Sequence, residues 1–205
     1  GPAQLTTLAL TPQGTVATTL NETRVTFDNI AAPVLYASSG QTSVIVPYEL
    51  NGKQSAQMVV EYRGGRSAPL TVPVVQSKPA LFSANASGRG QGAILNADFS
   101  YNSSTNPVAK GGIVLLFGTG EGPIDPPGVT GRVNSAVFPR ILLPTAVTIG
   151  GQSARVLYAG AAPGQVGGLF QMNVEVPQGV ASGNQEVIVT IGNTRSQSGV
   201  TVAVQ

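Results

Sequence analysis

The side chains that most often carry enzymatic chemistry are missing from this chain. It contains nine acidic residues and eleven Lys and Arg residues, but no His and no Cys. Histidine is the usual general base near neutral pH, and cysteine supplies thiolate nucleophiles and soft metal ligands. A Ser-His-Asp triad cannot be built, no Gly-x-Ser-x-Gly sequence is present, and no lysine stands three residues after a serine. The composition therefore argues against an enzyme.

One pair of carboxylates is close enough in sequence to be weighed as a catalytic pair. Glu121 and Asp125 lie four positions apart on the Gly- and Pro-rich segment 118–128. Glycoside hydrolysis needs two carboxyl groups held about 5–10 Å apart across the scissile bond. A Gly- and Pro-interrupted loop fixes no such separation, so solvated loop carboxylates are the favoured interpretation.

Two polar motifs have the outline of ligand-binding loops. The run Gly118-Thr-Gly-Glu-Gly122 is rich in glycine like a phosphate-binding loop, but it lacks the Lys-Ser/Thr ending and a following helix. Asn96, Asp98, Ser100 and Asn102 alternate like calcium ligands, but the run has no turning Gly and no closing Glu. Turning after a strand and local Asx-turns explain these motifs equally well. We predict no metal and no cofactor, while calcium at the second motif stays open.

Charge and hydropathy limit the partners. Only 10% of the residues are charged, the net charge is +2, and like charges form no cluster. Nucleic-acid binding normally requires a clustered basic face, so we expect no nucleic-acid partner. No apolar run reaches bilayer length, and no leader sequence opens the chain, so we expect no membrane span. Ser, Thr, Asn and Gln replace charge as the polar component, which is typical of secreted or surface bacterial β-modules.

Short runs of β-branched residues separated by Gly, Pro, Asn and Ser dominate the chain. No stretch of twelve residues has apolar positions at helical spacing. With 26 Gly and 15 Pro, long helices are disfavoured. The pattern predicts an all-β sandwich with strands at 44–46, 57–62, 70–75, 112–117, 187–191 and 200–204.

The chain also repeats itself. The thirteen residues from Val25 recur 122 positions later from Val147, with seven of the thirteen identical. Gln41-Thr-Ser-Val-Ile-Val-Pro47 then matches Gln171-Met-Asn-Val-Glu-Val-Pro177, Arg66-Ser67 matches Arg195-Ser196, and residues 70–74 match 200–204. Matches in the same order indicate two copies of one folding unit. We therefore predict a first domain over residues 1–78, a Pro-, Gly- and Ser-rich linker over 79–90, and a second domain over 91–205.

The opening strand of the second copy has no counterpart in the first copy. The segment from Ile113 to Thr119 precedes Val147 in the second copy, and its counterpart would precede Val25, before Gly1. One interpretation is that Gly1-Pro2 is a protease scar within a domain. The other is that another chain supplies the strand by β-strand addition, which would join subunits head to tail into a fibre.

Several motifs in order resemble a known family. They are Pro47, Gly90-Gln-Gly-Ala-Ile-Leu-Asn96, Asn106-Pro107, Phe117-Gly-Thr-Gly-Glu-Gly-Pro123, Val147-Thr-Ile-Gly-Gly151 and residues 156–164. Together they resemble the Solibacter-type uncharacterised C-terminal repeat domain of secreted acidobacterial proteins, which is similar to immunoglobulin-like IPT/TIG modules. The resemblance covers nearly the whole chain. It implies two tandem immunoglobulin-like sandwiches in an extracellular accessory module, with no catalytic residues to carry over.

Aromatic residues offer little for sugar binding. There are five Tyr, six Phe and no Trp, the usual sugar-stacking residue. Tyr36 and Tyr158 occupy matched positions in the repeat, which indicates packing. Tyr48, Tyr62 and Tyr101 are unmatched and are the better surface candidates.

From these observations we expect a non-catalytic extracellular structural or adhesive module that contacts protein, either itself or a neighbouring chain. The alternative is a polysaccharide-binding accessory module of a larger secreted enzyme. Immunoglobulin-like folds host both kinds of function, so the fold by itself does not choose between them.

Overall fold

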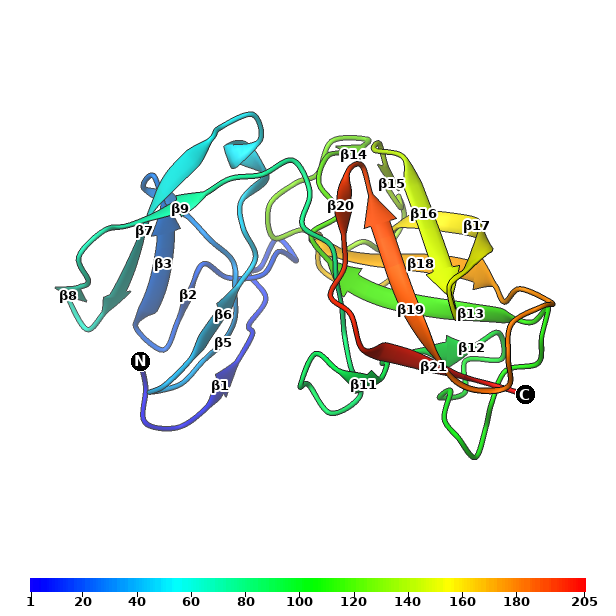
Figure 1. The fold of residues 1–205 in the computed structure, drawn as a ribbon. Helices are drawn as coiled ribbons and strands as arrows, with labels where there is room; N and C mark the ends of the chain where they lie inside the picture. Colours follow the sequence, from blue (N-terminus) through cyan, green and yellow to red (C-terminus); the bar gives the residue numbers. More distant parts are fainter. The chain divides into compact units, whose positions relative to one another are not determined.

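The computed structural model describes residues 1–205 and is all-β, as the sequence predicts. Its single helical element is the 3-10 turn Tyr48–Leu50. The chain forms two compact units that are not continuous in sequence. The first unit comprises residues 1–76, 127–137 and 164–168, and the second comprises 77–126, 138–163 and 169–205. Figure 1 shows the strands of both units.

Two sheets make up the first unit. The smaller has the order β1-β5-β6, with bounds Thr6–Thr7, Val34–Ala37 and Thr42–Val44. The larger runs β2-β3-β7-β8, with β4 paired to β3 and β9 paired to β7. Its strands are β2 Thr19–Leu20, β3 Thr23–Phe27, β4 Ile30–Ala31, β7 Ser55–Tyr62, β8 Gly65–Arg66 and β9 Leu70–Pro73.

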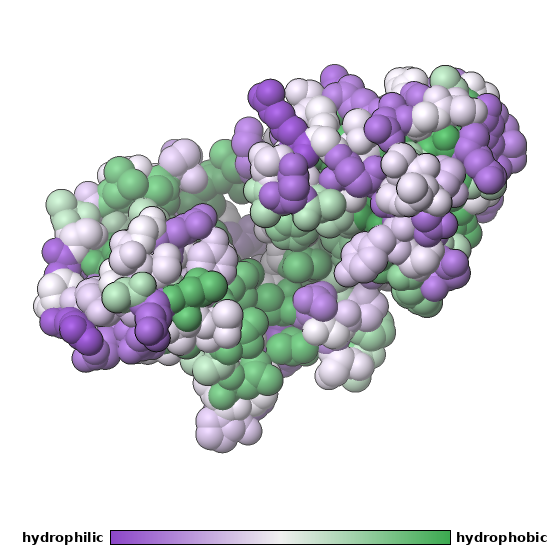
Figure 2. All heavy atoms as spheres, turned by 90° about the horizontal axis from the view of Figure 1, so that it is seen from below, coloured by the Kyte–Doolittle hydropathy of each residue, from purple (hydrophilic) through white to green (hydrophobic).

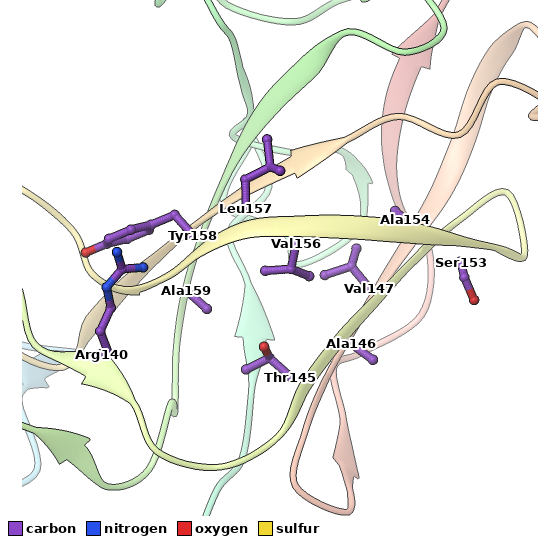
Figure 3. A pocket seen from close by; sticks show the side chains of 10 residues that line it. All are labelled: Arg140, Thr145, Ala146, Val147, Ser153, Ala154, Val156, Leu157, Tyr158 and Ala159. Carbon is purple, nitrogen blue, oxygen red and sulfur yellow. The ribbon is translucent and has the colours of Figure 1, made fainter.

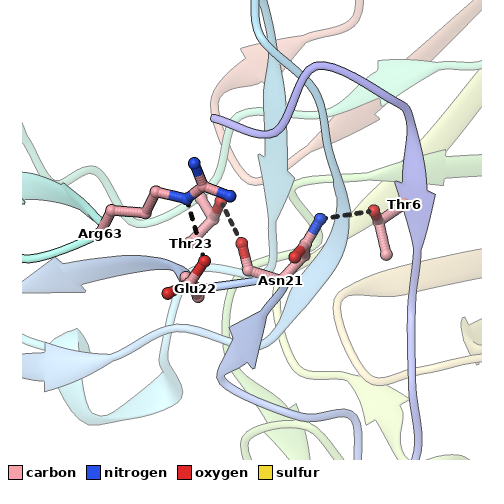
Figure 4. A network of polar contacts seen from close by, with 5 residues as sticks. All are labelled: Thr6, Asn21, Glu22, Thr23 and Arg63. Atoms are coloured by element: carbon pink, nitrogen blue, oxygen red, sulfur yellow. Dashed lines mark hydrogen bonds and ion pairs between the residues drawn. The ribbon is translucent and has the colours of Figure 1, made fainter.

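Residues in the left-handed region close the hairpins of the first unit. Asn21 and Glu22 have φ of 44° and 60° between β2 and β3, and Asp28 and Asn29 have φ of 49° and 66° between β3 and β4. Two successive positive φ values define the turn whose twist suits a two-residue hairpin, and Asn and Asp tolerate it best after Gly. Figure 4 shows that the first turn is tied to its surroundings, because Glu22 pairs with Arg63 at 3.0 Å and Asn21 donates to Thr6 at 3.4 Å.

A continuous path of strands, β10-β13-β18-β17-β16-β19-β21-β11, builds the second unit. The main strands are β13 Ile113–Thr119, β16 Thr145–Ile149, β17 Gln152–Ala161, β18 Leu169–Glu175, β19 Gly183–Ile191 and β21 Val200–Val204. The short ones are β10 Ala80–Leu81, β11 Gly90–Gln91, β12 Leu95–Asn96, β14 Ile124–Asp125, β15 Arg140–Ile141 and β20 Thr194–Arg195.

Strand β17 belongs to both layers of the second unit. Its residues 152–154 pair with β16, and residues from Arg155 onward pair with β18. Val, Ile, Leu, Phe and Met side chains from β13, β16, β18, β19 and β21 form one buried cluster between the layers. Alternation along β18, where Phe170, Met172 and Val174 are fully buried, is the expected pattern of a strand with one face on a core.

Residues 79–90, for which the sequence favours a linker, contain structure that belongs to the second unit. Ala80–Leu81 pairs with the end of β13, and Gly90–Gln91 runs parallel to the start of β21. Leu81 is buried, while Phe82 is exposed. This stretch therefore covers both edges of the second unit's sheets.

Sequence matches between the copies coincide with matched pairing. A bulge interrupts β5 and β6 between Val34 and Tyr36, and the same bulge interrupts β17 and β18 between Val156 and Tyr158. Ser67 Oγ accepts a hydrogen bond from the Val60 N–H at 3.0 Å, and Ser196 Oγ accepts one from the Val189 N–H at 3.1 Å. The repeated residues thus occupy repeated positions in the hydrogen-bond ladders.

Candidate functional site

The two acidic residues singled out in the sequence lie in different environments. Glu121 follows β13 and is only 4% exposed, whereas Asp125 ends β14 and is exposed. No group of three or more His, Cys, Asp or Glu side chains is placed to hold a metal ion. The expectation of solvated loop carboxylates is therefore confirmed for Asp125 and is wrong for Glu121, which is buried.

The glycines that follow β13 serve close packing and turning. Gly118 lies within β13, and a Cβ there would come within 2.5 Å of the Phe170 ring and would also meet the Ala80 carbonyl oxygen. Gly120 and Gly122 have φ of 84° and 77°, which favours glycine. Close packing at Gly118 and turning at Gly120 and Gly122 account for these glycines.

The polar loop that resembles a calcium site is held by its own hydrogen bonds. Asp98 Oδ1 accepts from the Ser100 hydroxyl at 2.6 Å and from the Ser100 N–H at 3.0 Å, which is an Asx-turn. These two bonds lower the pKa of Asp98 below its usual value. Asn102 Nδ2 donates to Asn96 Oδ1 at 3.0 Å. The side chains are partnered with one another.

Tyr101 is the one unmatched tyrosine that is highly exposed, at 78%, and Phe99 beside it is 73% exposed. Both belong to the loop of the second unit that carries the Asx-turn. Tyr48 and Tyr62 are half-buried, as is Tyr36. Sequence reasoning selected Tyr101 because it has no counterpart in the repeat, but it missed Phe99.

The first notable surface feature is an open sheet edge in the first unit. Strand β6 is the last strand of its sheet, whereas its sequence counterpart β18 lies between β17 and β13. Val44 is half-buried and Val46 is 55% exposed, while their counterparts Val174 and Val176 are 0% and 1% exposed. The second unit buries these positions because β13 covers them.

A second open edge lies along β9 in the same unit. Leu70 is 56% exposed and Val72 is half-buried, but their counterparts Val200 and Val202 are fully buried. In the second unit β11 pairs with β21, Val108 bridges to Val204, and Leu81, Ile94 and Val108 enter the core. The first unit has no strands at the positions that β10, β11, β12 and β13 occupy in the second unit.

Hydrophobic atoms accordingly reach the surface of the first unit. Figure 2 shows them interrupting the polar surface at the left of the view, where this unit lies. The core of the unit is built from Val25, Phe27, Ala32, Leu50 and Ala56, and its neighbours Val44, Met58, Val60, Val72 and Val74 are only partly buried. The apolar side chains around this core are therefore partly accessible to solvent.

The second notable feature is a slot in the second unit, which sequence reasoning did not find. It has a volume of about 580 Å³ and lies between β16 and β17, where β17 leaves β16 to join β18. Its lining is Arg140, Thr145, Ala146, Val147, Ser153, Ala154, Val156, Leu157, Tyr158 and Ala159. Figure 3 shows Val147 and Val156 facing each other across the slot, with Arg140 beside Tyr158 at one end.

Arg140 and Tyr158 form the polar end of this slot. The guanidinium carbon lies 4.2 Å from the centre of the Tyr158 ring, which is cation–π distance. The Tyr158 hydroxyl donates to the Ala161 carbonyl oxygen at 2.6 Å. Partial burial raises the pKa of Tyr158 above its usual value, and the positive charge of Arg140 opposes that rise. The tyrosine is fixed in place and holds the arginine against its ring.

Neither a scan against protein-family models nor a search of curated proteins finds a match to this chain. The structure also holds no helix with the length and hydropathy needed to cross a bilayer.

Proposed function

We propose that this chain is a non-catalytic structural or adhesive module that joins another polypeptide by β-strand addition at the open edge of its first unit. In this proposal both units are immunoglobulin-like, as the resemblance to the Solibacter-type repeat domain implies, and the module works outside the cell or at its surface. The observation that carries the proposal is the exposure of Val44 and Val46 where Val174 and Val176 are buried.

The physical argument combines backbone and side chains. An edge strand presents unpaired N–H and C=O groups, which pair readily with an incoming strand. Each buried apolar side chain contributes roughly 1.5–3 kcal/mol relative to full exposure, so covering this edge is favourable. Both effects act at the same place, because Val44 packs against the core and belongs to β6, the last strand of its sheet.

The second unit indicates the chemistry of the partner strand. There β13 runs antiparallel to β18, with Val114 opposite Val174 and Leu116 opposite Met172. By the repeat, a partner strand on β6 would place apolar side chains opposite Val44 and Thr42. The partly buried side chains that pack against the core of this unit, among them Val44 at the β6 edge, carry no charge, so an uncharged apolar strand is the matching partner.

The test uses a peptide with the sequence of residues 111–119 and the intact chain. We expect the peptide to bind and to shift the amide NMR signals of β5 and β6, while a version with aspartate at the positions of Val114 and Leu116 does not bind. Val44→Asp in the chain should abolish binding. Ser43→Asp is the control, because neighbouring side chains on a strand point to opposite faces.

Self-assembly is measured separately by light scattering and electron microscopy of the concentrated protein. Concentration-dependent oligomers that Val44→Asp removes would support a fibre built from copies of this chain. A strictly monomeric protein that also ignores the peptide would overturn the proposed function. Peptide binding by a monomeric protein would assign the strand to a different polypeptide.

A polysaccharide-binding module is the second candidate, favoured by the exposed neighbours Phe99 and Tyr101. Aromatic faces open to solvent can stack on sugar rings. A glycan-array signal that is lost in Phe99→Ala with Tyr101→Ala, but kept in Val44→Asp, would favour this candidate.

A further inference from the structure

The slot in the second unit has a counterpart in the first, and there it is filled. Thr23, Ala32, Val34 and Ala37 are all fully buried. Their sequence counterparts, Thr145, Ala154, Val156 and Ala159, line the slot and are only half-buried. The same positions are thus closed in one copy and open in the other.

The side chain that fills the first copy is Leu20. It is 6% exposed and forms a buried cluster with Val34 and Ala37. The residue 122 positions later, Leu142, is 60% exposed and does not line the slot. The second unit therefore lacks the leucine that occupies this space in the first.

The connecting segment before β3 and before β16 explains this difference. In the first unit the Ala17 carbonyl accepts a hydrogen bond from the Val34 N–H at 2.9 Å, so the segment passes between β3 and β5 at the level of Val34. In the second unit the Pro139 carbonyl accepts from the Ala161 N–H at 2.8 Å, five residues beyond Val156, the counterpart of Val34. The segment crosses further along β17 and leaves the space between β16 and β17 open.

Charge distinguishes the open slot as well. Arg140 lines it and takes part in none of the ion pairs of the structure, and no lining residue is acidic. The residue that corresponds to Arg140 in the first copy is Thr18. Asp125 lies opposite Arg140 in the β14–β15 pair but forms no ion pair with it. A guanidinium that makes no ion pair at the end of this slot favours an anionic group, above all a carboxylate or another planar oxyanion.

We propose that this slot binds a small aliphatic carboxylate. A branched hydrocarbon group would lie on Ala154, Val156 and Ala159, in the space that Leu20 fills in the first unit. The carboxylate would accept hydrogen bonds from Arg140, which is held in place by stacking on Tyr158. The volume of about 580 Å³ falls within the usual range of small-molecule sites. This inference is independent of the strand-acceptor proposal.

The probe is 4-methylpentanoate, which carries a leucine-like branched end and a carboxylate, titrated into the intact chain and followed by amide NMR shifts. We expect saturable shifts confined to β15, β16 and β17. The uncharged 4-methylpentanamide and the small anion acetate should each bind at least about tenfold more weakly. The amide lacks the charged contact with Arg140, and acetate lacks the branched hydrocarbon group. N-acetyl-leucine, titrated in parallel, shows whether the slot also takes the carboxyl end of a peptide.

Variants separate a specific site from a chance apolar surface. Arg140→Gln should weaken 4-methylpentanoate binding about tenfold or more without changing the weak binding of the amide. Arg155→Gln is the control, because Arg155 is an exposed arginine on β17 that does not line the slot and that pairs with Glu175 at 3.6 Å. Ala159→Leu should fill the slot and abolish binding, and unchanged NMR dispersion shows that it is folded.

The first unit supplies a further check. Leu20→Ala should open the corresponding space, which has Thr18 where the slot has Arg140, so any new binding there should not distinguish acid from amide. Equal binding of acid and amide by the unmodified chain would overturn the proposal. Shifts spread over both units, or unchanged affinity in both Arg140→Gln and Ala159→Leu, would also overturn it.

Discussion

At the residue scale, the clearest consequence of the repeat is a serine that ties two neighbouring strand segments together in each copy. Ser67 and Ser196 accept from Val60 and Val189 through their hydroxyls, and each also donates its own N–H to the carbonyl of the same valine. The two serines differ in burial, since Ser67 is exposed and Ser196 is 8% exposed. The same hydrogen bonds are thus made in water in one unit and in a core in the other.

This pair makes a matched prediction. Ser196→Ala leaves the buried Val189 N–H without its partner, which should lower the free energy of unfolding of the second unit by about 1–3 kcal/mol. Ser67→Ala should cost about 0.5 kcal/mol or less in the first unit, because water replaces the hydroxyl. Guanidinium titrations read by the NMR signals of each unit measure both changes. Equal losses in the two variants would contradict the argument.

At the element scale, the glycine within β13 sets how closely that strand packs. A Cβ at Gly118 would come within 2.5 Å of the Phe170 ring and would meet the backbone oxygen of Ala80. Neither neighbour can move freely, since Phe170 is fully buried and Ala80 belongs to β10, which pairs with β13. The close contact of β10, β13 and β18 therefore depends on this residue.

We accordingly expect Gly118→Ala to destabilise the second unit by about 1–3 kcal/mol, the usual cost of overpacking a core. Gly40→Ala is the control, because a Cβ there has no neighbour within 4 Å and its φ is not in the left-handed region. That variant should be neutral or slightly stabilising. Thermal unfolding of both variants measures the difference in stability. An unchanged stability in Gly118→Ala would contradict the prediction, because it would show that the strands move apart without destabilising the unit.

At the scale of the whole molecule, each unit is built from segments that are not continuous in sequence. The first unit includes residues 127–137 and 164–168, which come from the second half of the sequence. The Thr130 hydroxyl accepts from the Tyr48 N–H at 3.0 Å and donates to Glu49 at 2.6 Å, and the Gly131 carbonyl accepts from the Val16 N–H at 2.8 Å. The first seventy-six residues thus depend on segments beyond residue 126.

A fragment of residues 1–76 should therefore be less stable than the same residues in the intact chain. Three lost hydrogen bonds, at about 1 kcal/mol each, give a decrease of about 3 kcal/mol before any loss of apolar cover. Hydrogen exchange of the β3 and β7 amides in fragment and intact chain measures it. Identical protection would mean that residues 127–137 and 164–168 do not stabilise the first unit, which would contradict the prediction. Thr130→Val in the intact chain is the milder variant, expected to lose part of the same stability.

Much of this architecture could be predicted from local signals. Alternating β-branched residues in 187–191 and 200–204 gave correct strands, and the recurrence of Val-Leu-Tyr-Ala at 34–37 and 156–159 coincides with the same bulge in both copies. The open edge beside Val44 could be expected because the repeat revealed a strand without a counterpart. The slot could not be expected from the sequence, because it depends on where residues 17–20 and 139–142 cross the neighbouring strands. No local sequence pattern predicts that position.

The sequence by itself determined that the chain is all-β, that its two halves repeat, and that histidine and cysteine chemistry is excluded. These follow from residue type and period, which act over a few neighbours along the chain. Only the tertiary structure decided that residues 79–90 cover sheet edges, that residues 127–137 belong with the first unit, and that Leu20 is buried while Leu142 is exposed. The physical reason is that burial is set by contacts between residues far apart in the sequence. The same residue type at matched positions of the repeat is therefore buried in one unit and exposed in the other, depending on which side chains pack against it.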